Sequence, residues 1–121
     1  MTRVLIIEDQ TEHIALVKLR LTANGIEVSA ASTAAGGAAA AEKEKPDLIL
    51  LDLLLPDMPP EEAIRALRAV PGAAKTPILA LTALDPVEIR RRNLEGELSG
   101  VIAKPYEAKE LLNRIKKLTR K

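Results

Sequence analysis

The sequence predicts an α/β fold, with an open, doubly wound parallel sheet of five strands and helices on both faces. Short continuous apolar runs alternate along the chain with longer stretches whose apolar residues recur at helical spacing. Apolar runs of this kind are typical of strands that are covered on both faces, as in a parallel sheet. Right-handed crossovers between such strands place the connecting helices on both sides of the sheet.

Four apolar runs are predicted as buried strands, and a polar residue follows each of them. The runs are residues 4–7, 48–51, 78–81 and 101–103. The polar residues that follow are Glu8–Asp9, Asp52, Thr82 and Lys104. Residues 28–32 form a weaker candidate, because small and polar side chains there are more typical of an edge strand.

Five stretches are predicted as helices. They are residues 12–24, 33–45, 60–70, 86–94 and 108–119. Asn24–Gly25 is a stop signal for the first helix, and Pro60 suits the first turn of the third. Gly36–Gly37 lies inside the alanine-rich second stretch, where each glycine costs roughly 1 kcal/mol of helix stability. No long linker or repeat interrupts the alternation, which predicts a single domain over residues 1–121.

The composition excludes several kinds of site. The chain has no cysteine and one histidine, which excludes disulfides, thiolate metal sites and multi-histidine metal sites. One tyrosine with no phenylalanine or tryptophan excludes a base-stacking surface. A net charge of +1 argues against direct nucleic-acid binding by this chain. No run is long enough to span a membrane and no signal peptide is visible, which predicts a cytoplasmic protein without a membrane partner.

The polar strand ends predict a phosphoryl-transfer site. Ligands of open parallel sheets bind at the carboxyl ends of the strands, so we expect Glu8, Asp9, Asp52, Thr82 and Lys104 to converge. Three neighbouring carboxylates repel one another, and an oxygen-binding cation such as Mg²⁺ removes that repulsion. Beside Mg²⁺ and a lysine, Asp52 of the middle strand could attack a phosphoryl group and become an aspartyl phosphate.

Each of these residues also has a simpler interpretation when taken alone. Glu8–Asp9 could cap the first helix, Lys104 could be a solvated lysine, and Thr82 could be a strand-end residue. Their combined placement favours the metal site. His13 is expected to lie exposed in the first helical turn, and Tyr106 is expected to pack under the last helix.

Four segments carry a resemblance to a known family. They are Val4–Asp9, Asp47–Asp52 with Leu55–Met58 after it, Pro77–Ala83 and Ala103–Tyr106. In this order and spacing, they make the whole chain resemble the receiver domain of bacterial two-component response regulators. The resemblance implies a flavodoxin-like (βα)5 sheet. Because the sequence ends at its fifth helix, two alternatives stay open: a stand-alone regulator or phosphorelay intermediate, or a fragment of a larger regulator.

The resemblance also implies roles for individual residues. Asp52 would be the phospho-acceptor, Lys104 would contact the phosphoryl group ahead of a cis bond to Pro105, and Thr82 would be the switch hydroxyl. Mg²⁺ would be bound by Glu8, Asp9, Asp52 and the backbone carbonyl of Leu54. The protein would be a signalling switch with weak self-catalysed phosphoryl transfer and dephosphorylation, and not otherwise an enzyme.

The implied partners are proteins of a two-component pathway. The phosphoryl donor would be a phosphohistidine on a sensor histidine kinase or a histidine phosphotransfer protein. A downstream protein target would bind the basic face that carries Arg90, Arg91 and Arg92 together with the last helix.

Two departures from the family pattern leave an alternative open. Val101 stands where the family usually has an aromatic residue on the last strand, and Pro59–Pro60 stands where Asp–Gly is common. These departures motivate a pseudo-receiver alternative, an interaction module that works without phosphorylation. A phosphatase on the same sheet is weaker, because no second acid follows a nucleophilic aspartate at a spacing of two.

Overall fold

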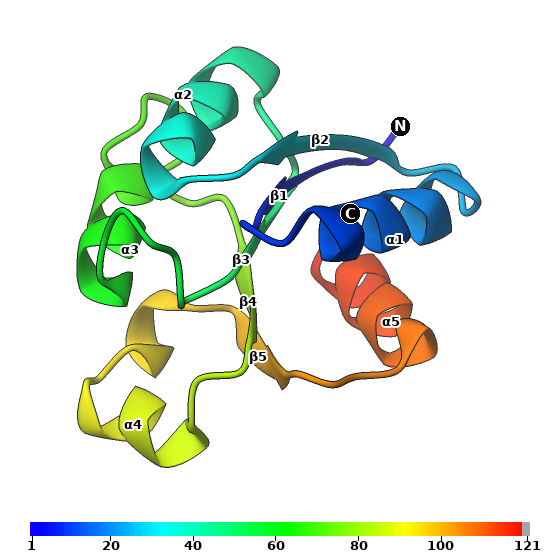
Figure 1. Cartoon of the computed structure of the whole chain (residues 1–121). Coiled ribbons are helices and arrows are strands. Elements are labelled where there is room, and N and C mark those ends of the chain that lie inside the picture. The colour runs from blue at the N-terminus through cyan, green and yellow to red at the C-terminus, as the bar shows by residue number, and fades with distance from the viewer. Residues whose placement is uncertain (120–121) are drawn as a thin grey trace.

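Five parallel strands form one sheet in the computed structural model, which describes residues 1–119 (Figure 1). The strands are β1 (Arg3–Ile7), β2 (Glu27–Ala31), β3 (Leu48–Leu51), β4 (Ile78–Thr82) and β5 (Gly100–Ala103). Their order across the sheet is β2-β1-β3-β4-β5, and each neighbouring pair is parallel. The predicted fold class is therefore confirmed, with β3 at the centre of the sheet and β2 at one edge.

The helices lie in the stretches where the sequence predicts them. They are α1 (Thr11–Thr22), α2 (Ala34–Glu44), α3 (Pro60–Arg68), α4 (Pro86–Arg91) and α5 (Ala108–Thr119), with a short 3-10 turn at Glu95–Glu97. The predicted fourth helix was too long, because Asn93 adopts a left-handed conformation that ends the helical path. None of the helices among the described residues is both long and apolar enough to cross a bilayer.

The helices divide between the two faces of the sheet, with α1 and α5 on one side and α2, α3 and α4 on the other (Figure 1). Each face has its own aliphatic core, and successive strand residues alternate between the two cores. In β1, Leu5 and Ile7 face the α2–α4 side, while Val4 and Ile6 face the α1–α5 side. This alternation explains why the buried strands are apolar at every position.

Helix α2 packs very close to the sheet, and this close packing explains the glycine at position 37. A Cβ atom at Gly37 would lie 2.4 Å from Cδ1 of the fully buried Ile7. The Thr33 hydroxyl caps this helix by accepting a hydrogen bond of 3.0 Å from the Gly36 amide. The carboxylate of Asp57, in the loop after β3, accepts hydrogen bonds from the first two amides of α2. That loop is thereby fixed to α2.

Candidate functional site

The polar residues that follow the strands are held in place by extensions of the sheet. The Asp52 amide donates a hydrogen bond of 3.0 Å to the carbonyl of Ile7, one residue beyond β3. The Lys104 amide donates a bond of 2.9 Å to the carbonyl of Thr82, one residue beyond β5. The backbone thus brings these residues to the same edge of the sheet, as the sequence predicts.

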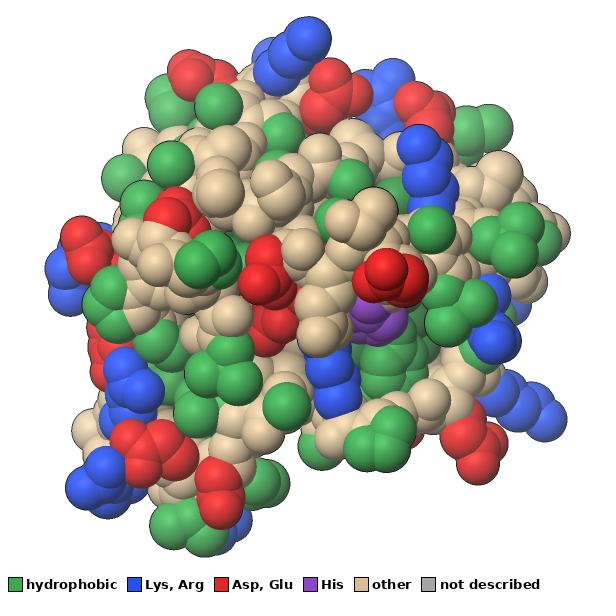
Figure 2. All heavy atoms as spheres, in the orientation of Figure 1, with side chains coloured by type: hydrophobic (Ala, Val, Ile, Leu, Met, Phe, Trp, Pro, Cys, Tyr) green, Lys and Arg blue, Asp and Glu red, His purple; other side chains and the backbone are tan. Residues whose placement is uncertain are grey.

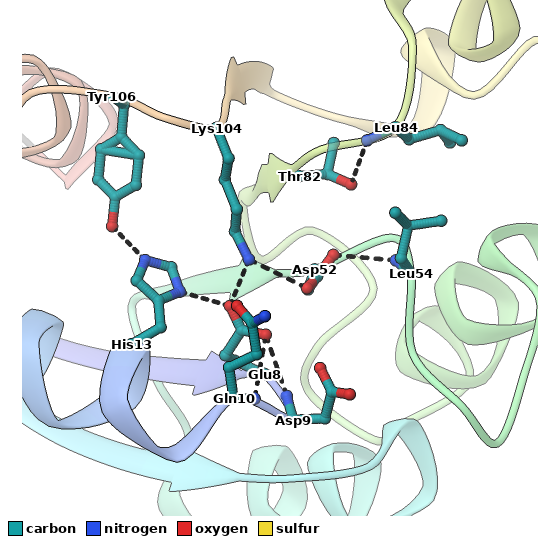
Figure 3. Close-up of polar contacts among 10 residues, drawn as sticks. All are labelled: Glu8, Asp9, Gln10, His13, Asp52, Leu54, Thr82, Leu84, Lys104 and Tyr106. Atoms are coloured by element: carbon teal, nitrogen blue, oxygen red, sulfur yellow. Dashed lines mark hydrogen bonds and ion pairs between the residues drawn. The ribbon is translucent and has the colours of Figure 1, made fainter.

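A buried ion cluster joins three of the predicted site residues (Figure 3). The Lys104 ammonium lies 2.6 Å from Oε1 of Glu8 and 3.2 Å from Oδ2 of Asp52. Glu8 is only 1% exposed and Asp52 only 6%. Red, blue and purple side chains meet near the centre of the face shown in Figure 2. One ammonium therefore bridges the carboxylates that follow β1 and β3.

Asp9 adds a third, exposed carboxylate to this cluster. One oxygen atom from each of Glu8, Asp9 and Asp52 lies within 4.8 Å of the others. With Lys104 as their cation, three ionised carboxylates leave two negative charges uncompensated. The donors are all oxygen atoms, which suits a small divalent cation such as Mg²⁺. The residues present therefore fit the metal that the sequence predicts for this edge.

The surroundings of Asp52 disfavour its charge. Burial raises the pKa of the Asp52 carboxyl, and the neighbouring Glu8 carboxylate raises it further. A hydrogen bond of 2.9 Å from the Leu54 amide to Oδ1 acts in the opposite direction without reversing the effect. The ionised Asp52 carboxylate, at the carboxyl end of the central strand, is thus disfavoured by burial and by its negative neighbour.

Glu8 and Lys104 are held in their charged forms. Burial opposes ionisation of Glu8, but hydrogen bonds from His13 and Lys104 outweigh it and hold the Glu8 pKa well below its usual range. Burial likewise opposes the charge on Lys104, and the two carboxylates outweigh it and raise the Lys104 pKa. The Lys104–Pro105 peptide bond is cis, as the resemblance implies.

Thr82 is completely buried at the end of β4. Its hydroxyl oxygen accepts a hydrogen bond of 3.1 Å from the Leu84 amide, in the loop that leads into α4 (Figure 3). Val101 stands where the family that the chain resembles usually has an aromatic residue. It is half-buried and packs against the core on the α2–α4 side. Thr82 is therefore connected to the loop before α4 by a backbone contact.

The prediction for His13 was wrong, and Tyr106 has a contact beyond the predicted packing. The His13 side chain is only 15% exposed, and its Nδ1 atom forms a hydrogen bond with the Glu8 carboxylate. Its Nε2 atom lies 2.5 Å from the Tyr106 hydroxyl. Tyr106 packs against the core beside α5 as predicted, but its hydroxyl faces α1. The pair is 93 residues apart in the sequence. The only sequence signal for this contact is that both residues lie in segments that follow strands of the sheet.

The predicted basic cluster on α4 is partly neutralised. The Arg92 guanidinium forms two hydrogen bonds, of 2.7 and 2.6 Å, with the Glu61 carboxylate of α3. Arg91 pairs with Glu88 on its own helix at 2.7 Å. The predicted basic face is therefore less positive at Arg92, because a facing carboxylate on α3 binds its side chain.

Comparison with known proteins identifies the family. Residues 4–116 match the family model described as the response regulator receiver domain. The chain belongs to this family. Receiver domains are signalling switches of two-component systems that interact with histidine kinases and downstream effectors.

Individual relatives agree with this assignment. Response regulator PleD of Caulobacter vibrioides is 34% identical over 118 residues, which are 98% of this receiver domain and 26% of PleD. The chain spans about a quarter to about half of the length of the curated relatives it matches. Among solved structures, chemotaxis response regulator CheY4 of Vibrio cholerae superposes with a TM-score of 0.87 at 28% identity, covering 98% of both chains.

A second solved structure adds a metal to the comparison. The receiver domain of sensor histidine kinase PA1611 from Pseudomonas aeruginosa PAO1 superposes with a TM-score of 0.89 at 26% identity. The match covers 99% of this receiver domain and 98% of that chain. That structure has a magnesium ion coordinated in its active site cleft.

The raised pKa of Asp52 predicts that replacing this residue stabilises the metal-free receiver domain. The folded state binds the Asp52 proton more tightly than the unfolded chain does. The contribution of Asp52 to the free energy of unfolding therefore falls as the pH rises from about 4 through the raised pKa. Asp52→Asn keeps an acceptor for the Leu54 amide and removes the buried charge. We expect the free energy of unfolding to increase by about 0.5–2 kcal/mol at pH 7.

Urea unfolding of both proteins in EDTA at several pH values measures this effect. The difference should shrink toward zero below pH of about 4, where Asp52 is protonated in both states. A less stable Asp52→Asn protein at pH 7 would contradict the electrostatic interpretation.

Proposed function

We propose that this receiver domain accepts a phosphoryl group on Asp52 in a Mg²⁺-dependent phosphorelay. One observation carries the proposal: Asp52 is a buried carboxylate at the end of the central strand, with the Lys104 ammonium 3.2 Å away and two further carboxylates around it. A carboxylate nucleophile, a fixed cation and a cation-binding acidic set are the parts that phosphoryl transfer requires.

The reaction we propose is a transfer from a phosphohistidine. A carboxylate oxygen of Asp52 forms the new bond to phosphorus, and the bond from phosphorus to the donor imidazole breaks. The electron pair of that bond stays on the imidazole nitrogen, which can take up a proton. The donor would be a sensor histidine kinase or a histidine phosphotransfer protein.

Mg²⁺ would be held by the carboxylates of Glu8, Asp9 and Asp52 and by the backbone carbonyl of Leu54. The all-oxygen donor set and its excess negative charge support this assignment, as does the magnesium ion in the PA1611 receiver domain. When bound, the metal supplies positive charge against the negative oxygens of the phosphoryl group.

Lys104 and Thr82 would bind the phosphoryl oxygens directly. The Lys104 ammonium already lies between the two buried carboxylates, so a short movement of a flexible side chain would bring it to a group on Asp52. The Thr82 hydroxyl would exchange its contact with the Leu84 amide for one with the phosphoryl group. Both groups would stabilise charge on the transferring oxygens.

Mass spectrometry after incubation with acetyl phosphate and Mg²⁺ tests the proposal. We expect the wild-type chain to gain one phosphoryl group and Asp52→Asn to gain none. Asp57→Asn is the matched control, because it removes a neighbouring carboxylate of the same loop that contacts α2 and not the ion cluster.

The same experiment distinguishes phosphoryl transfer to Asp52 from the pseudo-receiver alternative. An adduct that persists in Asp52→Asn would place the acceptor elsewhere. No adduct with acetyl phosphate or with a phosphorylated histidine donor would favour an interaction module that works without phosphorylation, as the valine at position 101 suggests.

Two leucines near the acceptor predict slow self-dephosphorylation. Leu54 and Leu84 lie two residues after Asp52 and Thr82, and their backbone amides bind those two side chains. Apolar side chains there cannot orient an attacking water by hydrogen bonding. Leu54→Asn should shorten the phosphoryl lifetime, measured with Mg²⁺ and no phosphatase, whereas Leu19→Asn on α1 should leave it unchanged. An unchanged lifetime in Leu54→Asn would contradict this role.

A downstream partner would bind the face that carries Arg90, Arg91 and Arg92 together with α5. Arg90 is exposed, while the charges of the other two are shared with Glu88 and Glu61. We therefore expect Arg90→Ala to weaken binding of the purified output partner more than Arg92→Ala does, in a surface plasmon resonance titration. Lys75→Ala, an exposed loop substitution, is the control. Equal affinities for Arg90→Ala and wild type would reject this surface.

A further inference from the structure

Glu8 has a second buried partner besides the lysine of the ion cluster. His13, in the first turn of α1, bonds through Nδ1 to Oε1 of Glu8, the same oxygen that Lys104 contacts at 2.6 Å. The other Glu8 oxygen accepts hydrogen bonds from the Asp9 and Gln10 amides, at 3.1 and 3.4 Å. The Glu8 carboxylate is thus held by donors on both of its oxygens.

Tyr106 holds the other side of the imidazole. Its hydroxyl lies 2.5 Å from Nε2 of His13, and the two rings meet edge to face with centroids 5.6 Å apart. Nδ1 faces the Glu8 carboxylate, which can only accept, and therefore carries the proton of that hydrogen bond, while Nε2 faces the Tyr106 hydroxyl. Burial raises the pKa of Tyr106 to about 12, so the phenol keeps its proton and can donate it to that nitrogen.

The two donors on Oε1 of Glu8 would behave differently during phosphoryl transfer, because only Lys104 would turn toward the phosphoryl group. Lys104 would turn toward the phosphoryl group under the proposed function, and Glu8 would then lose its ammonium partner. Once the ammonium turns away, the orientation of the buried Glu8 carboxylate toward the metal depends on the donors that remain on its two oxygens. His13 comes from α1 and bonds to Tyr106 from the loop after β5, so neither of its two contacts is made through the Lys104 side chain (Figure 3).

We propose that His13 and Tyr106 form a positioning pair that holds the Glu8 carboxylate in the orientation required for Mg²⁺ binding. The inference rests on the proposed function, because it concerns the same metal site. His13 and Tyr106 would act through Glu8 and would touch neither the metal nor the phosphoryl group. Hydrogen-bond partners of metal-binding carboxylates commonly change metal affinity by about 10–100-fold.

The Mg²⁺ dissociation constant of the unphosphorylated full chain tests the pair, read from amide shifts of ¹⁵N-labelled protein. His13→Leu should weaken Mg²⁺ binding by about 10–100-fold, and Tyr106→Phe should weaken it less. The double variant should be no weaker than His13→Leu, because Tyr106 acts through the imidazole. His13→Gln, which keeps a donor and an acceptor, should recover most of the affinity. Lys18→Leu, at an exposed position of the same helix, is the matched control.

Several outcomes would overturn the inference. One is that His13→Leu binds Mg²⁺ as tightly as the control. Another is that the losses of Mg²⁺ affinity in His13→Leu and Tyr106→Phe add up in the double variant. Tyr106→Phe keeps the packed ring and removes one oxygen, so an unchanged affinity there overturns it even if His13→Leu fails to fold. His13 is the only histidine of the chain, and an imidazole ¹⁵N signal from an unprotonated Nδ1 would also overturn it.

Failure of this inference is distinguishable from failure of the proposed function. A wild-type chain that forms the Asp52 adduct while all variants bind Mg²⁺ equally contradicts the positioning pair alone. A wild-type chain that binds Mg²⁺ with the expected loss in His13→Leu, yet forms no adduct, contradicts the proposed function alone.

Discussion

The buried ion cluster of Glu8, Asp52 and Lys104 is the constraint on which the rest of this molecule depends. Two carboxylates that are almost inaccessible to water can stay ionised only beside a fixed cation and several hydrogen-bond donors. The parallel sheet meets that requirement, because β1 and β3 are neighbours and both end at the same edge. Lys104, which follows β5, reaches past the end of β4 to Asp52 and past β4 and β3 to Glu8 because its side chain is long.

The loops around the cluster are fixed by contacts of their own. The loop after β3 begins at Asp52, whose Oδ1 binds the Leu54 amide, and it continues to Asp57, whose carboxylate binds the start of α2. Helix α2 in turn packs so tightly on β1 that Gly37 has no room for a side chain beside Ile7. Gly37, a residue type that weakens a helix by itself, thus permits a close contact between α2 and β1.

Sequence patterns could predict the strand ends but not the contacts made by single side chains. Continuous apolar runs and the rule for parallel sheets were sufficient to place Glu8, Asp52, Thr82 and Lys104 at one edge. His13 escaped prediction because its partners lie before its helix and on a loop distant in sequence, where helical periodicity carries no information. The contact of Arg92 was not predicted for the same reason, since its carboxylate partner Glu61 belongs to another helix.

The lack of an aromatic residue on β5 changes how a movement at the site would reach the surface. Val101 fills its place in the core with a short, branched side chain that has few rotamers. The Thr82 hydroxyl, in contrast, is bonded to the Leu84 amide, two residues before α4 begins. If that hydroxyl turns toward a phosphoryl group, the loop loses an anchor to the strand, and α4 stays tied to α3 by the Arg92–Glu61 pair. The hydrogen bond between the Thr82 hydroxyl and the Leu84 amide, and not an aromatic side chain on β5, would then connect the site to α4.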